Sequence, residues 1–203
     1  MGGPRIIVPY TAVLTYHPGT YSRAVHGIDV HVCWTADEPL ALSYVLKGDF
    51  TRLRSPPPRP ARRADCLWQH TCFEAFVAMK GKPEYYEFNF APSGEWAAYA
   101  FHGYRDGAPL AKEELTPGIT VRSAAHSLEL DAMIRLDRLP AIERGAPLRL
   151  ALSAVVEEEH GILSYWALKH PPDKPDFHHS DAFALELEAP VVEAVQESAV
   201  CKR

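Results

Sequence analysis

The sequence predicts an all-β protein, an antiparallel β-sandwich or jelly roll of about ten strands with little helix. Most short segments alternate apolar and polar residues with a period of two, the pattern of a strand with one buried face. The 18 prolines and 12 glycines separate these segments. The one stretch with a helical pattern, residues 136–144, is short and contains Pro140. Helices therefore cannot cover a parallel sheet, and antiparallel pairing is expected.

The predicted strands account for most of the chain. The alternation is clearest in residues 28–34, 40–47, 128–134, 148–156 and 183–187. Aromatic and β-branched side chains, which favour a pleated surface, are frequent in residues 85–90, 96–101, 119–123 and 162–168. Ser93 and Gly94 are expected to form the turn between two of these strands. One more strand, residues 67–79, carries the most information about function.

A single domain is expected over residues 1–190, followed by a C-terminal tail at 191–203, because no internal repeat divides the chain. Residues 52–63, RLRSPPPRPARR, combine three consecutive prolines with five arginines. This composition is typical of an extended loop without regular hydrogen bonding.

Charge and cysteine content narrow the class of protein. The formal charge of −5 gives no general attraction to nucleic acid or to an anionic membrane. The N-terminal segment lacks the apolar stretch of a signal peptide, and no segment approaches about 18 consecutive apolar residues. A cytoplasmic location is therefore predicted. The four cysteines (Cys33, Cys66, Cys72 and Cys201) form no CxxC motif, which favours reduced thiols over a zinc ribbon or a disulfide framework.

The strand predicted at residues 67–79, LWQHTCFEAFVAM, presents two different faces. The residues at odd positions are all apolar from Phe73 to Met79, and this face is expected to pack against the core. The other carries Trp68, His70 and Glu74, with about 7 Å between successive positions of that parity. An indole can stack on the C–H surface of a sugar ring, while imidazole and carboxylate groups bind its hydroxyls. The alternative is that Trp68 packs at a sheet edge and Glu74 pairs with an arginine on a neighbouring strand.

Four segments resemble, in chain order, bacterial DOMON-like proteins related to family 9 carbohydrate-binding modules. They are LWQHTCFEAFV, YYEFNFAPSGEWAAYAFHGYRDG, SYWALKHP and PDFHHSDAFALEL, and they run from about Leu67 to Leu187. The resemblance implies a DOMON fold, an immunoglobulin-like or jelly-roll-like β-sandwich with a ligand site on one side. Sugars bind there in the carbohydrate-binding modules, and haem b binds in the cytochrome members. No catalytic residue set comes with the resemblance.

The resemblance carries over to this strand residue by residue. In the sugar-binding modules the corresponding strand carries a tryptophan, an acidic pair and then a glutamate. Trp68 and Glu74 match this pattern, whereas His70 and Thr71 stand where the acidic residues are expected. At these two positions the chain therefore departs from the sugar-binding pattern of the family, and it lacks the acidic pair that a metal role would need.

The resemblance also implies a second aromatic ring, since those modules hold sugar between two rings. Trp166 in SYWAL is the candidate, with Trp96 behind it. The closing PDFH, which ends at His178, is similar to the family's last loop before the final strand.

Two groups of arginines are candidates for anion recognition. Arg59, Arg62 and Arg63 directly precede the Trp68 strand and could reach a carboxylate or phosphate on a sugar. A solubilising loop is the alternative for these three. Arg105 in GYRDG is a second candidate, and its alternative is a salt bridge with Asp106 or Glu74.

Haem b and metal ions are weaker expectations. Axial ligation of haem in the cytochrome members needs a methionine and a histidine that converge on one iron, but Met79 falls on the face opposite His70. His170, His178 and His179 lie among aspartates, yet their spacing matches no known closed metal site. For them a solvated loop is the alternative, and no metal ligand is predicted.

The sequence therefore predicts a non-catalytic domain that binds a saccharide or sugar derivative without a cofactor, and no nucleic acid or membrane. The predicted binding residues are Trp68, His70, Glu74, Trp96, Arg105, Trp166 and His178. Two alternatives stay open. One is a haem-binding or redox-partner module, and the other is an enzyme that uses His70 or Glu74 as acid or base.

Overall fold

The computed structural model describes residues 8–34, 39–54, 57, 59–110 and 113–188. Within these ranges the chain forms thirteen strands and six single turns of 3-10 helix. The predicted all-β sandwich is confirmed, with more strands than the expected ten. No helix in the described ranges has the length and apolar character needed to cross a membrane. Residues 191–203, predicted to be a tail, lie outside the described ranges.

Five antiparallel strands form the back sheet of the sandwich. In spatial order they are β1 (Val8–Tyr16), β2 (Val25–Trp34), β3 (Leu40–Gly48), β10 (Ser127–Ile134) and β9 (Gly118–Ala124). Four of them match predicted strands, whereas β1 was not predicted. Its sequence, VPYTAVLTY, contains an early proline and alternates less regularly than the others.

The front sheet contains the other strands. In spatial order they are β4 (Arg62–Arg63), β7 (Glu95–Gly103), β6 (Tyr85–Phe90), β5 (Cys72–Met79), β11 (Leu148–Glu157) and β12 (Leu163–Ala167). Two short strands attach to it, β8 (Asp106–Pro109) to β7 and β13 (Leu185–Leu187) to β11. All pairings are antiparallel except that of β4 with β7. The turn from β6 to β7 contains Gly94 at φ 90°, as the Ser93-Gly94 prediction requires.

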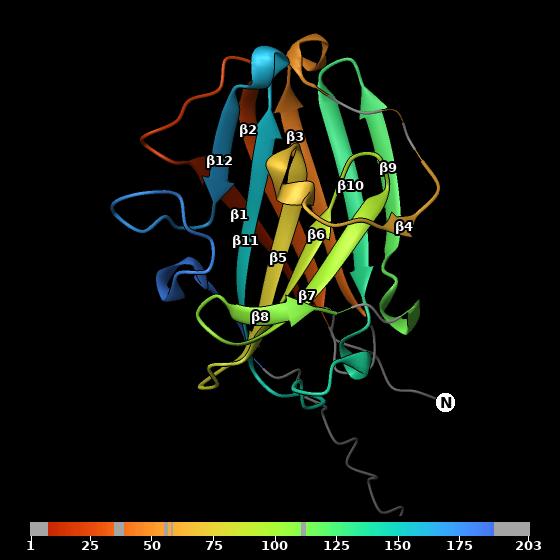
Figure 1. Ribbon diagram of the computed structural model, residues 1–203, viewed down its shortest axis with the longest axis vertical. Helices are drawn as coiled ribbons and strands as arrows, with labels where there is room; N and C mark the ends of the chain where they lie inside the picture. Colours follow the sequence, from red (N-terminus) through yellow and green to blue (C-terminus); the bar gives the residue numbers. More distant parts are fainter. Residues whose placement is uncertain (1–7, 35–38, 55–56, 58, 111–112, 189–203) are drawn as a thin grey trace, which may run out of the picture.

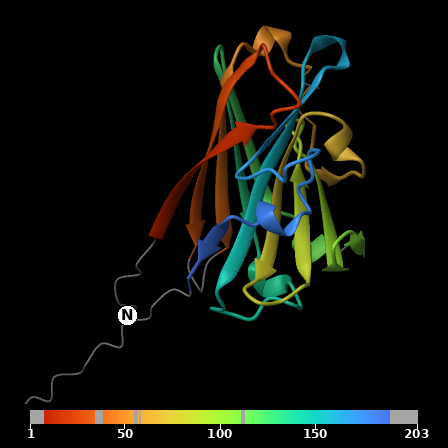
Figure 2. The ribbon, with the colours of Figure 1, turned by 90° about the vertical axis from the view of Figure 1, so that its left-hand side faces the viewer.

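Strand β1 links the two sheets. Its first part pairs with β2, and its last residues pair with β12, where Thr15 lies opposite Ala167. The sheet therefore curls over on itself, and Figures 1 and 2 show the two layers facing each other. The inward side chains of both layers form one core, in which the largest fully buried members include Tyr44, Phe73 and Phe88. The Tyr44 hydroxyl spans the layers and donates to the Glu74 carbonyl at 2.8 Å.

The helical pattern at residues 136–144 yields only one 3-10 turn, η4 (Leu136–Arg138). The strand predicted from Leu67 is wrong over its first five residues. Residues Leu67–Gln69 form the 3-10 turn η2, and β5 begins at Cys72. Cys66 takes the left-handed conformation at φ 61°, which turns the chain just before Leu67. Backbone bonds then close the turn, with His70 N donating to Leu67 O at 3.0 Å.

A third layer covers the outward face of the front sheet. It consists of η2, the β7–β8 hairpin and the segment between β12 and β13, which contains η6 (Ser180–Ala182) (Figure 2). Beneath it lies a second apolar cluster that includes Phe76, Tyr85, Phe177 and Phe183. This layer does not close completely, and the gap that it leaves is the candidate site.

Candidate functional site

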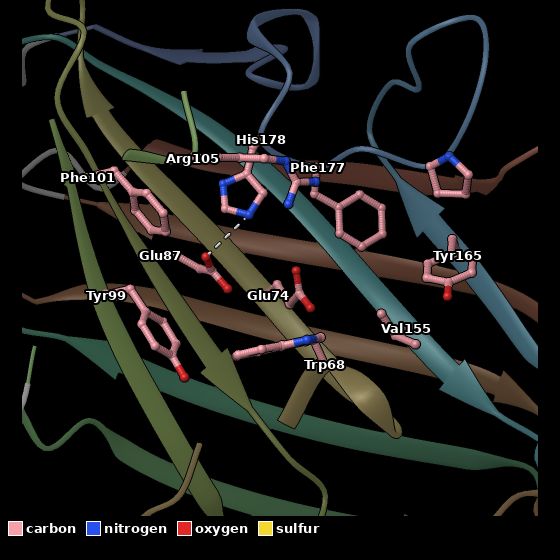
Figure 3. A pocket seen from close by; sticks show the side chains of 11 residues that line it. Trp68, Glu74, Glu87, Tyr99, Phe101, Arg105, Val155, Tyr165, Phe177 and His178 are labelled. Carbon is pink, nitrogen blue, oxygen red and sulfur yellow. Dashed lines mark ion pairs between the residues drawn. The ribbon is translucent and has the colours of Figure 1, made fainter. Parts of the chain in front are cut away.

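A cavity of about 350 Å³ lies between the front sheet and the layer that covers it (Figure 3). We call it the carboxylate pocket. It is lined by Trp68, Glu74, Glu87, Tyr99, Phe101, Arg105, Val155, Tyr165, Pro175, Phe177 and His178. Its size falls within the range of small-molecule sites, and a mainly aromatic wall around a few polar groups is typical of them.

Two glutamates on neighbouring strands form its polar floor. Glu74 on β5 pairs in register with Asn89, and Glu87 on β6 pairs with Phe76, so both carboxyl groups point to the outward face. Figure 3 shows them directed into the same space. Glu74 is 3% exposed and Glu87 is 5% exposed. Asn89 fixes Glu87 by donating from Nδ2 to Oε1 at 2.8 Å.

Burial and mutual repulsion hold these carboxyl groups toward their neutral forms. Burial raises the pKa of Glu87 to about 7, although Asn89 and Arg105 act in the opposite direction. Burial also raises the pKa of Glu74 well above its usual value, and the charge of Glu87 adds to this effect. A neutral carboxyl donates one hydrogen bond and accepts others, whereas a carboxylate only accepts. The pair can therefore both give and receive hydrogen bonds near neutral pH.

Arg105 reaches the pocket from the β7–β8 hairpin, where it adopts a left-handed conformation at φ 56°. Its Nη2 donates to Asp176 Oδ1 at 2.7 Å, so the salt bridge expected with Asp106 or Glu74 is made with Asp176 instead. Tyr104 donates to the other oxygen of Asp176 at 2.6 Å. This contact ties the hairpin to the segment that follows β12. Half of the Arg105 side chain stays exposed and faces the pocket.

His178 closes one end of the pocket. Its Nδ1 lies 2.8 Å from the Tyr85 hydroxyl, and its Nε2 lies 3.6 Å from Glu87 Oε2. Burial, with the positive charge of Arg105, lowers the pKa of His178 to about 4. The imidazole is therefore neutral at pH 7, and its contact with Glu87 is a polar contact rather than an ion pair.

Aromatic rings form the walls and the rim. Trp68 projects from η2 and is 41% exposed, with its ring edge-on to Tyr99 at a centroid distance of 5.7 Å. Phe101 stands beside Tyr99 on β7, and Tyr165 and Phe177 lie across the pocket from them (Figure 3). Such rings present the flat apolar faces on which the C–H surface of a ring-shaped ligand can pack.

Four of the seven predicted binding residues meet in this pocket: Trp68, Glu74, Arg105 and His178. Although the strand was predicted to start too early, Trp68 still arrives here, because η2 folds back over the sheet.

The other three predicted residues do not line the pocket. His70 follows η2 and lines a different cavity, where its Nδ1 lies 2.7 Å from Glu157 Oε2. Trp96 and Trp166 are each 3% exposed and belong to the core between the sheets. On β7 and β12 these two positions face the core. The neighbouring residue Tyr165 faces outward and lines the pocket, where the second ring was expected from Trp166.

Glu87, Tyr99, Phe101, Tyr165 and Phe177 were not among the predicted residues. A signal for Glu87 is present in YYEFNF, where a carboxylate interrupts a strand of aromatic residues. Tyr99, Phe101 and Tyr165 sit in strands with apolar residues on both faces, so periodicity does not show which face they take.

The arginines before Trp68 are neutralised by acidic partners. Arg62 binds Glu95 Oε1 through Nε at 2.8 Å and Nη2 at 2.6 Å, and Arg59 lies 3.7 Å from the same oxygen. Arg63 makes a two-point contact with Asp65 at 2.9 and 2.7 Å. Because acidic partners already occupy these arginines, the pairs disfavour anion capture by this loop.

The pocket does not fit haem held by a methionine and a histidine. Met79 faces the core, where its sulfur accepts from Glu143 N at 3.1 Å, and Met133 lies 48% exposed on the back sheet. Over the described ranges no methionine lines the pocket. In the same ranges no group of three or more His, Cys, Asp or Glu residues is arranged to hold a metal ion.

Two solved structures resemble this fold. One is a "putative carbohydrate-binding protein" from Bacteroides uniformis ATCC 8492, with a TM-score of 0.61, 14% identity, and coverage of 85% of this chain and 82% of that one. The other is a family 9 carbohydrate-binding module from Caldicellulosiruptor kristjanssonii in complex with cellotriose, with a TM-score of 0.51, 10% identity, and coverage of 86% and 76%.

Comparison by sequence adds no further relative. No protein-family model matches the chain, and no curated protein sequence matches it. The fold is thus shared with carbohydrate-binding modules of family 9, while the more specific likeness to DOMON-like proteins stays a prediction.

Proposed function

We propose that this protein is a non-catalytic binding domain for a saccharide or sugar derivative, which it holds in the carboxylate pocket. The observation that carries the proposal is the combination of Glu74 and Glu87, buried at the floor, with aromatic rings on the walls. Few small molecules other than polyols offer both an apolar C–H face and several hydroxyl groups at this scale.

The polar groups suit hydroxyl ligands. Sugar hydroxyls donate and accept hydrogen bonds, and so can two carboxyl groups whose pKa values are raised above their usual range. Arg105 adds donors, since Asp176 engages only part of its guanidinium group. A buried carboxyl left without a partner costs free energy, so hydroxyl groups that satisfy both glutamates would be selected over apolar ligands.

The fold comparison agrees with this proposal. The Caldicellulosiruptor module that shares the fold was solved with cellotriose bound. At 10% identity the likeness concerns the fold alone, so the proposal rests on the chemistry of the pocket.

Isothermal titration calorimetry with mono-, di- and trisaccharides, including cellotriose, tests the proposal. Trp68→Ala is expected to weaken saccharide binding by about tenfold or more, because the ring loses its packing on the sugar. Its thermal stability should change little, since the side chain is 41% exposed. Tyr21→Ala is the matched control, an exposed aromatic at 55% that lies outside the pocket.

The outcomes separate the parts of the proposal. If no saccharide binds, or if Trp68→Ala binds as tightly as the unmodified protein, the assignment of the pocket is wrong. Recovery of the ligand after long incubation tests the non-catalytic part. A hydrolysed ligand would instead favour an enzyme that uses Glu74 and Glu87 as its acid and base.

A further inference from the structure

A second cavity adjoins the carboxylate pocket and differs from it in charge. We call this cavity of about 420 Å³ the basic pocket, and its polar lining includes Lys82, Tyr85, Arg149 and His178. His178 lines both cavities, and its Nδ1 lies 2.8 Å from the hydroxyl of Tyr85, which lines the basic pocket, so this pair forms part of the wall between the two. A ligand that extends past this wall would enter both.

The basic pocket carries two cations, and within the described residues no carboxylate lines it. Lys82 stands in the exposed turn between β5 and β6 and forms no ion pair with a described residue. The nearby Lys80 is already engaged, since its ammonium group lies 2.8 Å from Glu186 Oε2. The carboxylate pocket shows the opposite arrangement, with two glutamates at its floor.

Arg149 is held in place by groups that do not neutralise it. Its Nη2 donates to the carbonyls of Ser180 at 3.2 Å and Phe183 at 3.3 Å, and its guanidinium lies over the Phe183 ring at 5.8 Å. Glu186 pairs in register with Arg149 and its carboxylate feels the charge of Arg149, but its ion pair is made with Lys80. A guanidinium group fixed in this way is preorganised to bind a carboxylate or a phosphate.

We propose that the basic pocket is an anion subsite of the saccharide site, and that the ligand is therefore an acidic or phosphorylated saccharide. This inference rests on the proposed function. The hydroxylated part of the ligand occupies the carboxylate pocket, and its anionic group reaches Lys82 and Arg149. The reverse orientation is disfavoured, because it would place an anion against Glu74 and Glu87.

Matched ligand pairs test the subsite: glucose against glucuronate, galactose against galacturonate, and glucose against glucose 6-phosphate. The acidic or phosphorylated member is expected to bind more tightly at low salt. Lys82→Gln should weaken binding of the charged ligand about threefold to fivefold, the range of a partly exposed ion pair. It should leave binding of the neutral sugar unchanged. High salt should reduce the same preference.

A lysine on the back sheet gives the control. Lys47→Gln removes one charge at a residue outside the basic pocket, so it should keep the preference. Arg149→Gln should lower the preference for the charged ligand further. Because Arg149 also binds the η6 segment, an unchanged affinity of this variant for the neutral sugar would show that the segment has not moved.

Each remaining outcome decides between the two proposals. If neutral sugars bind and their charged partners bind equally or less well, the subsite is wrong and the proposed function stands. If inorganic phosphate raises the melting temperature of the unmodified protein but not of Lys82→Gln, while no saccharide binds, then the saccharide assignments of both pockets are wrong. If neither sugar nor phosphate binds, both proposals fail.

Discussion

The two sheets share one core but differ in what their outward faces meet. On the back sheet, buried and more exposed residues alternate along β3 and β10, and outward charges form exposed pairs such as Lys47 with Asp29 at 2.6 Å. On the front sheet, every residue of β5 from Cys72 to Met79 is buried. The covering layer of η2, the β7–β8 hairpin and the η6 segment accounts for this difference (Figure 2).

The two faces differ in how strongly they desolvate their charged side chains. An exposed pair on the back sheet is well hydrated and contributes little free energy. Glu74 and Glu87 stand at equivalent outward positions of the front sheet, but they are desolvated and have no cationic partner within ion-pair distance in the described chain. Buried carboxyl groups with raised pKa values are more frequent at functional sites than elsewhere, and this supports the proposal that the ligand binds on the covered face.

The largest expected effect is on stability. Phe76→Ala should lower the free energy of unfolding by about 3–5 kcal/mol, because Phe76 is fully buried on the outward side of β5 against Tyr85 and Phe183. Val45→Ala, at an outward and half-buried position of β3, should cost about 1 kcal/mol or less. Denaturant unfolding measures both. Equal losses would show that the covering layer packs no better than an exposed face.

A smaller effect concerns the pH dependence of stability. The pKa of Glu87 is about 7 in the folded protein and about 4.5 without the fold, so the unfolded chain releases its proton first as pH rises. Stability due to Glu87 is present below pH 4.5 and is lost as pH rises to about 7. Glu87→Gln removes this loss. Between pH 5 and pH 8 the variant should gain about 2 kcal/mol relative to the unmodified protein.

Urea unfolding at several pH values measures this difference. His178, whose pKa is lowered to about 4, contributes stability that rises between about pH 4 and 6.5, and it is present in both proteins. Glu159→Gln, at an exposed turn, is the control and should show no such gain. A Glu87→Gln variant whose stability relative to the unmodified protein is independent of pH would contradict the desolvation of the floor.

Periodicity predicted the strands well where one face meets solvent. Leu128, Leu130, Ala132 and Ile134 alternate with exposed or half-exposed residues, and β10 has these bounds to within one residue. In β7 and β12 apolar residues occupy both faces, so the same method could not tell that Trp96 faces the core and Tyr165 faces the pocket. Which residues face the core and which face the pocket depends on the packing of the covering layer, and the sequence of the strand does not show it.

The site was predictable only in part for the same reason. Glu74 was found because a carboxylate in an apolar strand needs an explanation. The start of β5 was misplaced, since nothing in LWQH signals the left-handed conformation at Cys66 that creates η2. Phe177 was missed because its segment reaches the pocket through contacts with a hairpin about 70 residues away, such as Arg105 with Asp176, and local patterns do not encode these contacts.

The smallest expected effect concerns two exposed histidines, one on each side of the sandwich. His70 contacts Glu157, which also accepts from Arg54 Nη1 at 2.9 Å, and this network holds the end of η2 against β11. The ring of His31 on the back sheet makes one hydrogen bond to a described residue, to Thr11 Oγ1 at 3.2 Å. His70→Ala should cost about 1 kcal/mol of stability and weaken saccharide binding severalfold, because Trp68 loses part of its support. His31→Ala should change neither quantity. Calorimetry and denaturant unfolding compare them, and equal behaviour of the two variants would show that η2 holds Trp68 without His70.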